Sequence, residues 1–169
     1  NDRLDRYLDK YGNTAEDMLQ AQIWAKNNTA QGAVFLTDPS WQPGWRDYSQ
    51  RPTFGHYRDW ALFGFAYNSS QFWYQEGLRR MKLFGADPIE LAKSLTDRGD
   101  SVWLTNKLIR EVINENYNTR SIDSLVQLAR DERVSFVVVK NDRFTGSRFG
   151  HAPVFSSKYF DIYEVGKAR

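Results

Sequence analysis

Cysteine is absent from the 169 residues of this chain. Its absence excludes disulfides, thiolate zinc sites and cysteine nucleophiles. Histidine is scarce as well, because the chain contains only 2 such residues, and no H-x-x-x-H spacing joins them. We therefore expect no metal site, and nothing in the sequence indicates a cofactor. A chain of this length can still bury a substantial hydrophobic core without disulfides or metals.

Long apolar runs and a strong charge of one sign are also missing. The longest apolar stretch, residues 60–67, is far shorter than the roughly 20 residues that span a bilayer. The formal net charge is +2, and the most prominent block of like charges is Arg79-Arg80. These features predict a water-soluble chain that does not bind nucleic acid.

Strand and helix patterns alternate along the chain. Apolar runs at 33–37 and 134–139 predict buried strands, residues 158–165 alternate like a half-exposed strand, and 51–55 predict a further short strand. Amphipathic segments between these runs predict helices. The alternation predicts an α/β fold with a mostly parallel central sheet flanked by helices, and with an antiparallel edge strand near the C-terminus.

Local signals define several boundaries. Residues 1–13 carry a short apolar stripe and are interpreted as a linker or stalk helix, and residues 14–169 as a single α/β domain. Asp87-Pro88 predicts a helix start, because it combines an N-cap with proline at the first helical position. Gly85 is expected to end the preceding helix in the left-handed conformation, and Ser121 to cap a later helix. The helix before Gly85 is expected to carry Tyr74, Leu78, Met81 and Phe84.

Aromatic residues are frequent and gather after the first strand. They make up 15% of the chain, and many lie in residues 40–50, which are predicted as a loop, and just beyond it. In open α/β sheets, ligands bind beyond the carboxyl ends of the strands. Aromatic rings can stack on a sugar, and charged groups can pair with an anion. The predicted binding residues are Asp38, Trp41, Trp45, Arg46, Asp47, Tyr48, Arg51 and His56.

Other interpretations of these residues stay open. The aromatic residues could cap the core beneath a long loop while the charged ones are solvated. His56 with Asp38, Asp47 or Asp59 could form a metal or hydrolase site. A Ser-His-Asp nucleophile is not indicated, because no G-x-S-x-G motif is present. Residues 140–151 form a basic, glycine-containing segment that could contact a phosphate or a lipid headgroup. A P-loop is excluded there, because its G-x-x-x-x-G-K-[ST] pattern is missing.

Four segments follow one another along the chain: Trp24 to Thr29, Ala33 to Thr37, Trp45 to Tyr48 and Arg51 to Phe54. Their order resembles the soluble domain of oligosaccharyltransferase catalytic subunits. In that domain a helix ending in Trp and an Asn-Thr pair leads to a short strand, a Trp-Trp-Asp-Tyr-Gly motif and an Arg-Pro strand. The order is also similar to C-terminal domains of polytopic bacterial membrane proteins of the glycosyltransferase C type, which end in a Val-rich and a Tyr-rich strand. Arg46 and Ser49 stand where the motif has Trp and Gly. The matching segments are Trp24 to Thr29, Ala33 to Thr37, Trp45 to Tyr48, Arg51 to Phe54, Val134 to Lys140 and Pro153 to Val165.

The resemblance implies an extracytoplasmic domain, periplasmic or at the cell surface, that is tethered through the membrane portion of a larger glycosyltransferase-like protein. In that superfamily the catalytic carboxylates lie mainly on loops of the membrane portion. The resemblance therefore implies that this domain is not catalytic alone and contributes contacts to an acceptor, a glycan or a lipid-linked sugar. The alternatives are a secreted or periplasmic carbohydrate-binding module and a small hydrolase that uses Asp38 and His56.

Overall fold

A computed structural model describes residues 14–41, 44–66, 71–101, 104–141 and 152–166. The interpreted stalk at 1–13 and nearly all of the basic segment 140–151 lie outside the described residues. The chain groups into two compact units, and the single domain over 14–169 stays a prediction. Unit 1 comprises Asn1–Thr37, Pro43–Phe54 and Ser121–Arg169, and unit 2 comprises Asp38–Gln42 and Gly55–Arg120.

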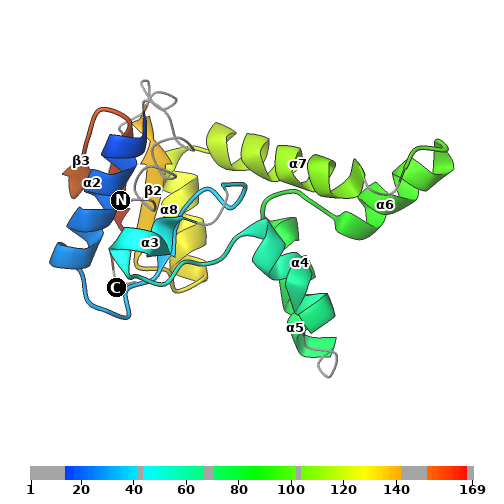
Figure 1. Ribbon diagram of the computed structural model, residues 1–169, viewed down its shortest axis with the longest axis horizontal. Coiled ribbons are helices and arrows are strands. Elements are labelled where there is room, and N and C mark those ends of the chain that lie inside the picture. The colour runs from blue at the N-terminus through cyan, green and yellow to red at the C-terminus, as the bar shows by residue number, and fades with distance from the viewer. Residues whose placement is uncertain (1–13, 42–43, 67–70, 102–103, 142–151, 167–169) are drawn as a thin grey trace. The chain divides into compact units, whose positions relative to one another are not determined.

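Unit 1 is built on a four-stranded mixed sheet (Figure 1). Its strands are β1 (Phe35–Leu36), β2 (Phe136–Lys140), β3 (Phe155–Ser156) and β4 (Phe160–Glu164), in the order β1-β2-β4-β3. β1 is parallel to β2, whereas β4 is antiparallel to both β2 and β3. The α/β class is confirmed, and the sheet has an antiparallel edge strand near the C-terminus, β3. The predicted half-exposed strand at 158–165 corresponds to β4, and its half-exposed character was wrong, because β4 lies between β2 and β3 and is largely buried.

The prediction of a mostly parallel sheet is not supported, because one strand pair is parallel and two are antiparallel. Parallel neighbours need a crossover of about a dozen residues or more, and residues 157–159 between β3 and β4 are too few. They form a tight turn in which the Ser157 N–H donates to the Phe160 carbonyl. The predicted strand at 51–55 reduces to a single parallel bridge between Thr53 and Phe35.

Helices cover both faces of this sheet. Successive side chains of a strand point to opposite faces, and Val137, Val138 and Val139 are all fully buried. Figure 1 draws β2 between α2 (Ala15–Asn28) and α8 (Ile122–Asp131). α8 begins as predicted, since the Ser121 hydroxyl accepts a hydrogen bond from a backbone N–H of the first turn.

The described residues of unit 2 contain helices and no strand. Its helices are α4 (Tyr57–Ala66), α5 (Gln71–Leu83), α6 (Pro88–Asp97) and α7 (Thr105–Thr119). The core is aromatic: the Trp60 ring stacks on Phe84 with centroids 5.8 Å apart, and Phe84 contacts Tyr117 at 6.1 Å. These three rings join α4 and α7 to the end of α5.

The turn between α5 and α6 follows the predicted chemistry. Gly85 has a φ of +77°, which is the left-handed conformation that favours glycine. The Asp87 carboxylate accepts hydrogen bonds from the N–H groups of Ile89 and Glu90. It also lies 2.7 Å from the Lys82 ammonium. Asp87 therefore caps α6 and joins it to α5 through one side chain.

Candidate functional site

The predicted binding residues are divided between the two units. Asp38, Trp41 and His56 belong to unit 2. Trp45, Arg46, Asp47, Tyr48 and Arg51 belong to unit 1. The structure therefore separates the predicted residues into two sets, and each residue has its own partners.

Both carboxylate oxygens of Asp38 accept hydrogen bonds. Its side chain is buried. One carboxylate oxygen accepts hydrogen bonds from the Ser40 N–H at 2.8 Å and the Ser40 hydroxyl at 2.6 Å. The other accepts from the amides of Asn114 at 3.1 Å and Asn118 at 3.0 Å. A carboxylate has about four lone-pair sites, so these four donors occupy them. Asp38 thereby fastens the start of unit 2 to α7.

The partners of Asp38 escaped the sequence analysis. Asn114 and Asn118 are four residues apart and so lie on one face of α7. They flank Tyr117, which is fully buried. Burial, and then the charge of Asp38, raise the pKa of Tyr117 well above the ordinary value for a tyrosine. The sequence contained one signal from which this network could have been predicted: two asparagines at helical spacing, next to an aromatic residue.

Trp41 and His56 also make local contacts. The Trp41 N–H donates to the Asp38 carbonyl, and the Trp41 side chain is half-buried. The His56 Nδ1 accepts the Arg58 N–H at 3.1 Å. An Asp59 oxygen accepts the backbone N–H of His56, at 3.2 Å, and this contact helps to begin α4. The His56 ring packs against Tyr57 with centroids 4.6 Å apart.

Arg51 is a structural clamp in unit 1. Its Nε donates to the Thr29 hydroxyl at 3.1 Å, and Nη2 donates to the carbonyls of Thr29 and Lys26. Nη1 donates to the Gln50 carbonyl. The last carbonyls of a helix have no partner within the helix, and Arg51 supplies partners at the end of α2. The buried guanidinium is therefore occupied by main-chain oxygens and one hydroxyl.

The predicted loop over 40–50 contains a short helix, α3 (Trp45–Ser49). The loop prediction was wrong there, because side chains anchor this turn from both sides. The Trp45 ring is buried and lies 5.2 Å from the Phe35 ring, centroid to centroid. Gln22 of α2 accepts the Tyr48 N–H at 3.0 Å. The remaining predicted residues of α3 are Arg46 and Asp47, whose side chains are exposed.

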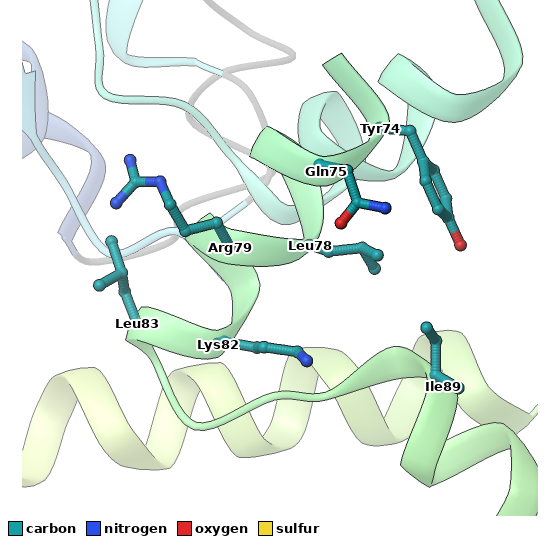
Figure 2. A pocket seen from close by; sticks show the side chains of 7 residues that line it. All are labelled: Tyr74, Gln75, Leu78, Arg79, Lys82, Leu83 and Ile89. Atoms are coloured by element: carbon teal, nitrogen blue, oxygen red, sulfur yellow. The ribbon is translucent and has the colours of Figure 1, made fainter. Parts of the chain in front are cut away.

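Unit 2 also contains a pocket that none of the predicted binding residues lines (Figure 2). Its volume is about 460 Å³, which falls within the range of small-molecule sites. α5 supplies most of its lining and α6 contributes one residue. The lining residues are Tyr74, Gln75, Leu78, Arg79, Lys82, Leu83 and Ile89.

The α5–α6 pocket exists because α5 is apolar on two faces. Met81 and Phe84 are buried, as predicted. Tyr74 and Leu78 were predicted on the same helix, but Tyr74 is 44% exposed and Leu78 is half-buried. Ile89, in the first turn of α6, is 54% exposed. Exposed apolar side chains that gather around a concave surface mark interaction sites.

Ion pairs border the α5–α6 pocket. The Glu76 carboxylate lies 2.7 Å from the Arg79 Nε and 2.7 Å from the Arg80 Nε. The hydrogen bond from Arg79, followed by that from Arg80, lowers the pKa of Glu76 to about 2. The hydrogen bond from Lys82 lowers the pKa of Asp87. Both carboxylates are therefore ionised and paired at neutral pH.

The Glu76 pairs make the stability of the protein depend on pH. The folded-state pKa of about 2 lies below the ordinary value of 4.5, so the stabilisation is present above about pH 4.5 and is lost as the pH falls towards 2. Because Arg79 is 45% exposed, we expect Glu76→Gln to lower the free energy of unfolding by only about 1 kcal/mol at neutral pH. Urea unfolding across this range measures the difference.

The matched control is Glu115→Gln, which changes an exposed carboxylate on α7. We expect that variant to differ from the wild type by less than about 0.5 kcal/mol at neutral pH. A Glu76→Gln difference that stayed constant between about pH 7 and pH 3 would show that the ion pairs do not carry the stabilisation.

The described residues limit the chemistry that can be assigned. They contain no group of three histidine, aspartate or glutamate side chains placed to hold a metal ion. No helix among them is both long enough and apolar enough to cross a membrane. The α5–α6 pocket, with its aromatic, amide and ion-paired side chains, is the candidate binding site. Comparison of the chain with protein-family models, curated proteins and solved structures finds no match.

Proposed function

We propose that this chain is an extracytoplasmic, glycan-contacting domain of a polytopic membrane protein of the glycosyltransferase C type, and that it is not catalytic alone. The α5–α6 pocket is the observation that carries the glycan part. A sugar ring has apolar C–H faces and a rim of hydroxyl groups. The exposed ring of Tyr74 suits the face, and the amide of Gln75 suits the rim, because an amide both donates and accepts hydrogen bonds. A binding site with these partners needs no reacting group.

The environment of Asp38 supports a structural role for its carboxylate and not a role as a general base. A general base must reach the proton that it removes within hydrogen-bond distance. The lone pairs of Asp38 are already taken by Ser40, Asn114 and Asn118. The structure therefore offers no argument for the hydrolase that Asp38 and His56 were considered to form.

The membrane-protein part of the proposal rests on the resemblance of the sequence segments. Its elements occur in unit 1 in the expected order: α2, then β1, then α3, then the bridge at Thr53. The sequence of the full-length protein tests it. We expect a series of apolar stretches of roughly 20 residues outside this domain. A full-length protein without them, but with glycan binding intact, would instead be a carbohydrate-binding module.

Tyr74→Ala tests the glycan part. We expect this variant to weaken glycan binding at least about tenfold, because the stacking and the apolar contact area of an aromatic ring together contribute about 1.4 kcal/mol or more. Titration of the wild type and the variant with a panel of oligosaccharides measures the effect. The fold should persist, since the side chain is 44% exposed.

Tyr159→Ala is the matched control. Tyr159 lies in the turn before β4 in unit 1 and does not line the α5–α6 pocket. We expect it to leave glycan affinity unchanged. Equal losses in both variants, or glycan binding that survives Tyr74→Ala, would remove the α5–α6 pocket as the site.

A further inference from the structure

We infer that the α5–α6 pocket takes an uncharged pyranose ring and does not bind the phosphate of a phosphorylated or lipid-linked sugar. This inference rests on the proposed glycan function and narrows it to one class of ligand. The pocket contains two cationic side chains, Arg79 and Lys82, which would ordinarily indicate an anion site. Their partners lead to the opposite conclusion.

The cations of the pocket are already paired. Arg79 makes two hydrogen bonds to the Glu76 carboxylate, at 2.7 and 2.9 Å. Lys82 lies 2.7 Å from Asp87. A bound phosphate would have to compete with these carboxylates for the donors and would meet their negative charge at close range. An uncharged hydroxyl meets no such repulsion.

The carboxylates of these pairs are themselves fixed in place. Glu76 is shared between Arg79 and Arg80. Asp87 also accepts two backbone N–H groups at the start of α6. Neither carboxylate can turn away to admit an anion without losing further hydrogen bonds, each of which contributes to the fold. These carboxylates therefore stay next to the two cations that line the pocket.

The lining offers partners for both parts of a pyranose ring (Figure 2). Tyr74, Leu78 and Ile89 lie on one side, the Gln75 amide lies between Tyr74 and Leu78, and Lys82 lies between Leu83 and Ile89. The first group offers an apolar wall for the C–H face of the ring. Hydroxyl groups donate and accept hydrogen bonds, so they can use both the amide of Gln75 and the ion-paired groups. Tyr74 is therefore assigned to stacking and Gln75 to hydroxyl recognition.

A nuclear magnetic resonance titration tests the inference with matched ligands. The wild type is titrated with methyl glycosides of glucose, mannose, galactose and N-acetylglucosamine, with the corresponding sugar 1-phosphates, and with inorganic phosphate. We expect at least one neutral glycoside to bind at least about tenfold more tightly than its phosphate. Inorganic phosphate should not compete with it.

Three variants assign the contacts. We expect Tyr74→Phe to keep the affinity within about twofold and Tyr74→Ala to lose at least about tenfold, because the ring face and not the hydroxyl carries the stacking. Glu76→Gln should raise the affinity for the sugar 1-phosphate at least about threefold, because it removes the carboxylate that competes with a phosphate for Arg79. An unchanged affinity for the sugar 1-phosphate in Glu76→Gln would overturn the role assigned to the ion pairs.

The possible outcomes distinguish a failure of this inference from a failure of the proposed glycan function. Binding of sugar phosphates alone, or displacement of the glycoside by inorganic phosphate, would overturn the inference while leaving the glycan function standing. Absence of binding to every sugar and to a panel of oligosaccharides would overturn both. Binding of neutral glycosides that survives Tyr74→Ala would place the sugar outside the α5–α6 pocket and overturn the inference.

Discussion

Replacing Asp38 by alanine is expected to lower the free energy of unfolding by about 3–5 kcal/mol. The carboxylate is 1% exposed and accepts hydrogen bonds from Ser40, Asn114 and Asn118. Removing it takes away the acceptor of one N–H in each α7 amide, while the other N–H groups keep Ser40 and the Asn114 carbonyl as partners. Each N–H that loses its acceptor costs about 1–3 kcal/mol. Urea unfolding of the wild type and of Asp38→Ala measures the loss.

Asp100→Ala is the matched control, because Asp100 is an exposed aspartate of the same unit. We expect it to change the free energy of unfolding by less than about 0.5 kcal/mol. Amide hydrogen exchange should also quicken at residues 38–41 in Asp38→Ala. A loss below about 1 kcal/mol would mean that Asp38 is free to serve another role, and would reopen the hydrolase interpretation.

Arg51→Ala is expected to lower the free energy of unfolding by about 2–4 kcal/mol. The guanidinium is 9% exposed and binds the carbonyls of Lys26 and Thr29 together with the Thr29 hydroxyl. These carbonyls end α2 and have no helical partners. Arg51→Lys should recover little of the loss, because an ammonium cannot reproduce the planar, divergent donors of a guanidinium.

The control for Arg51 is Arg46→Ala, since Arg46 is exposed on the neighbouring helix α3. We expect it to change the free energy of unfolding by less than about 0.5 kcal/mol. Thermal unfolding and urea unfolding should rank the stability losses of Arg51→Ala, Arg51→Lys and Arg46→Ala in the same order. Full stability in Arg51→Lys would show that the charge of Arg51, and not its hydrogen-bond geometry, is what unit 1 requires.

Local chemistry made several parts of the fold predictable. Gly85, Asp87 and Ser121 act on residues within a few positions of themselves, so their turn and capping roles follow from the sequence alone. The run of valines likewise predicted β2, because a strand that is buried on both faces has a continuous apolar sequence. Signals of this kind do not depend on the rest of the chain.

Features that depend on distant partners could not be predicted. The position of β4 between β2 and β3 depends on which strands pair across the sheet. The network at Asp38 joins it to Asn114, a residue 76 positions away. Tyr74 and Leu78 carry the same apolar chemistry as Met81, and only packing decides which of these side chains are buried. The α5–α6 pocket forms where this packing leaves Tyr74 exposed and Leu78 half-buried.

The predicted binding site illustrates why dense clusters are ambiguous in a sequence. Aromatic and charged residues gather after a strand both when they bind a ligand and when they secure a chain segment. Trp45 packs on Phe35, and Arg51 clamps the end of α2. The contacts of these two residues are structural, whereas Arg46 and Asp47 remain exposed on α3. Burial and partners, which the sequence does not contain, separate these cases.

Mapping a bound saccharide onto the backbone tests the glycan site most directly. Two-dimensional ¹⁵N spectra of the domain are recorded while a saccharide that binds it is added. We expect the shifted amides to lie in α5 and in the first turn of α6, around Tyr74, Gln75 and Ile89. Shifts confined to Arg46 and Asp47 of α3, or no shifts with any saccharide, would contradict glycan binding in the α5–α6 pocket.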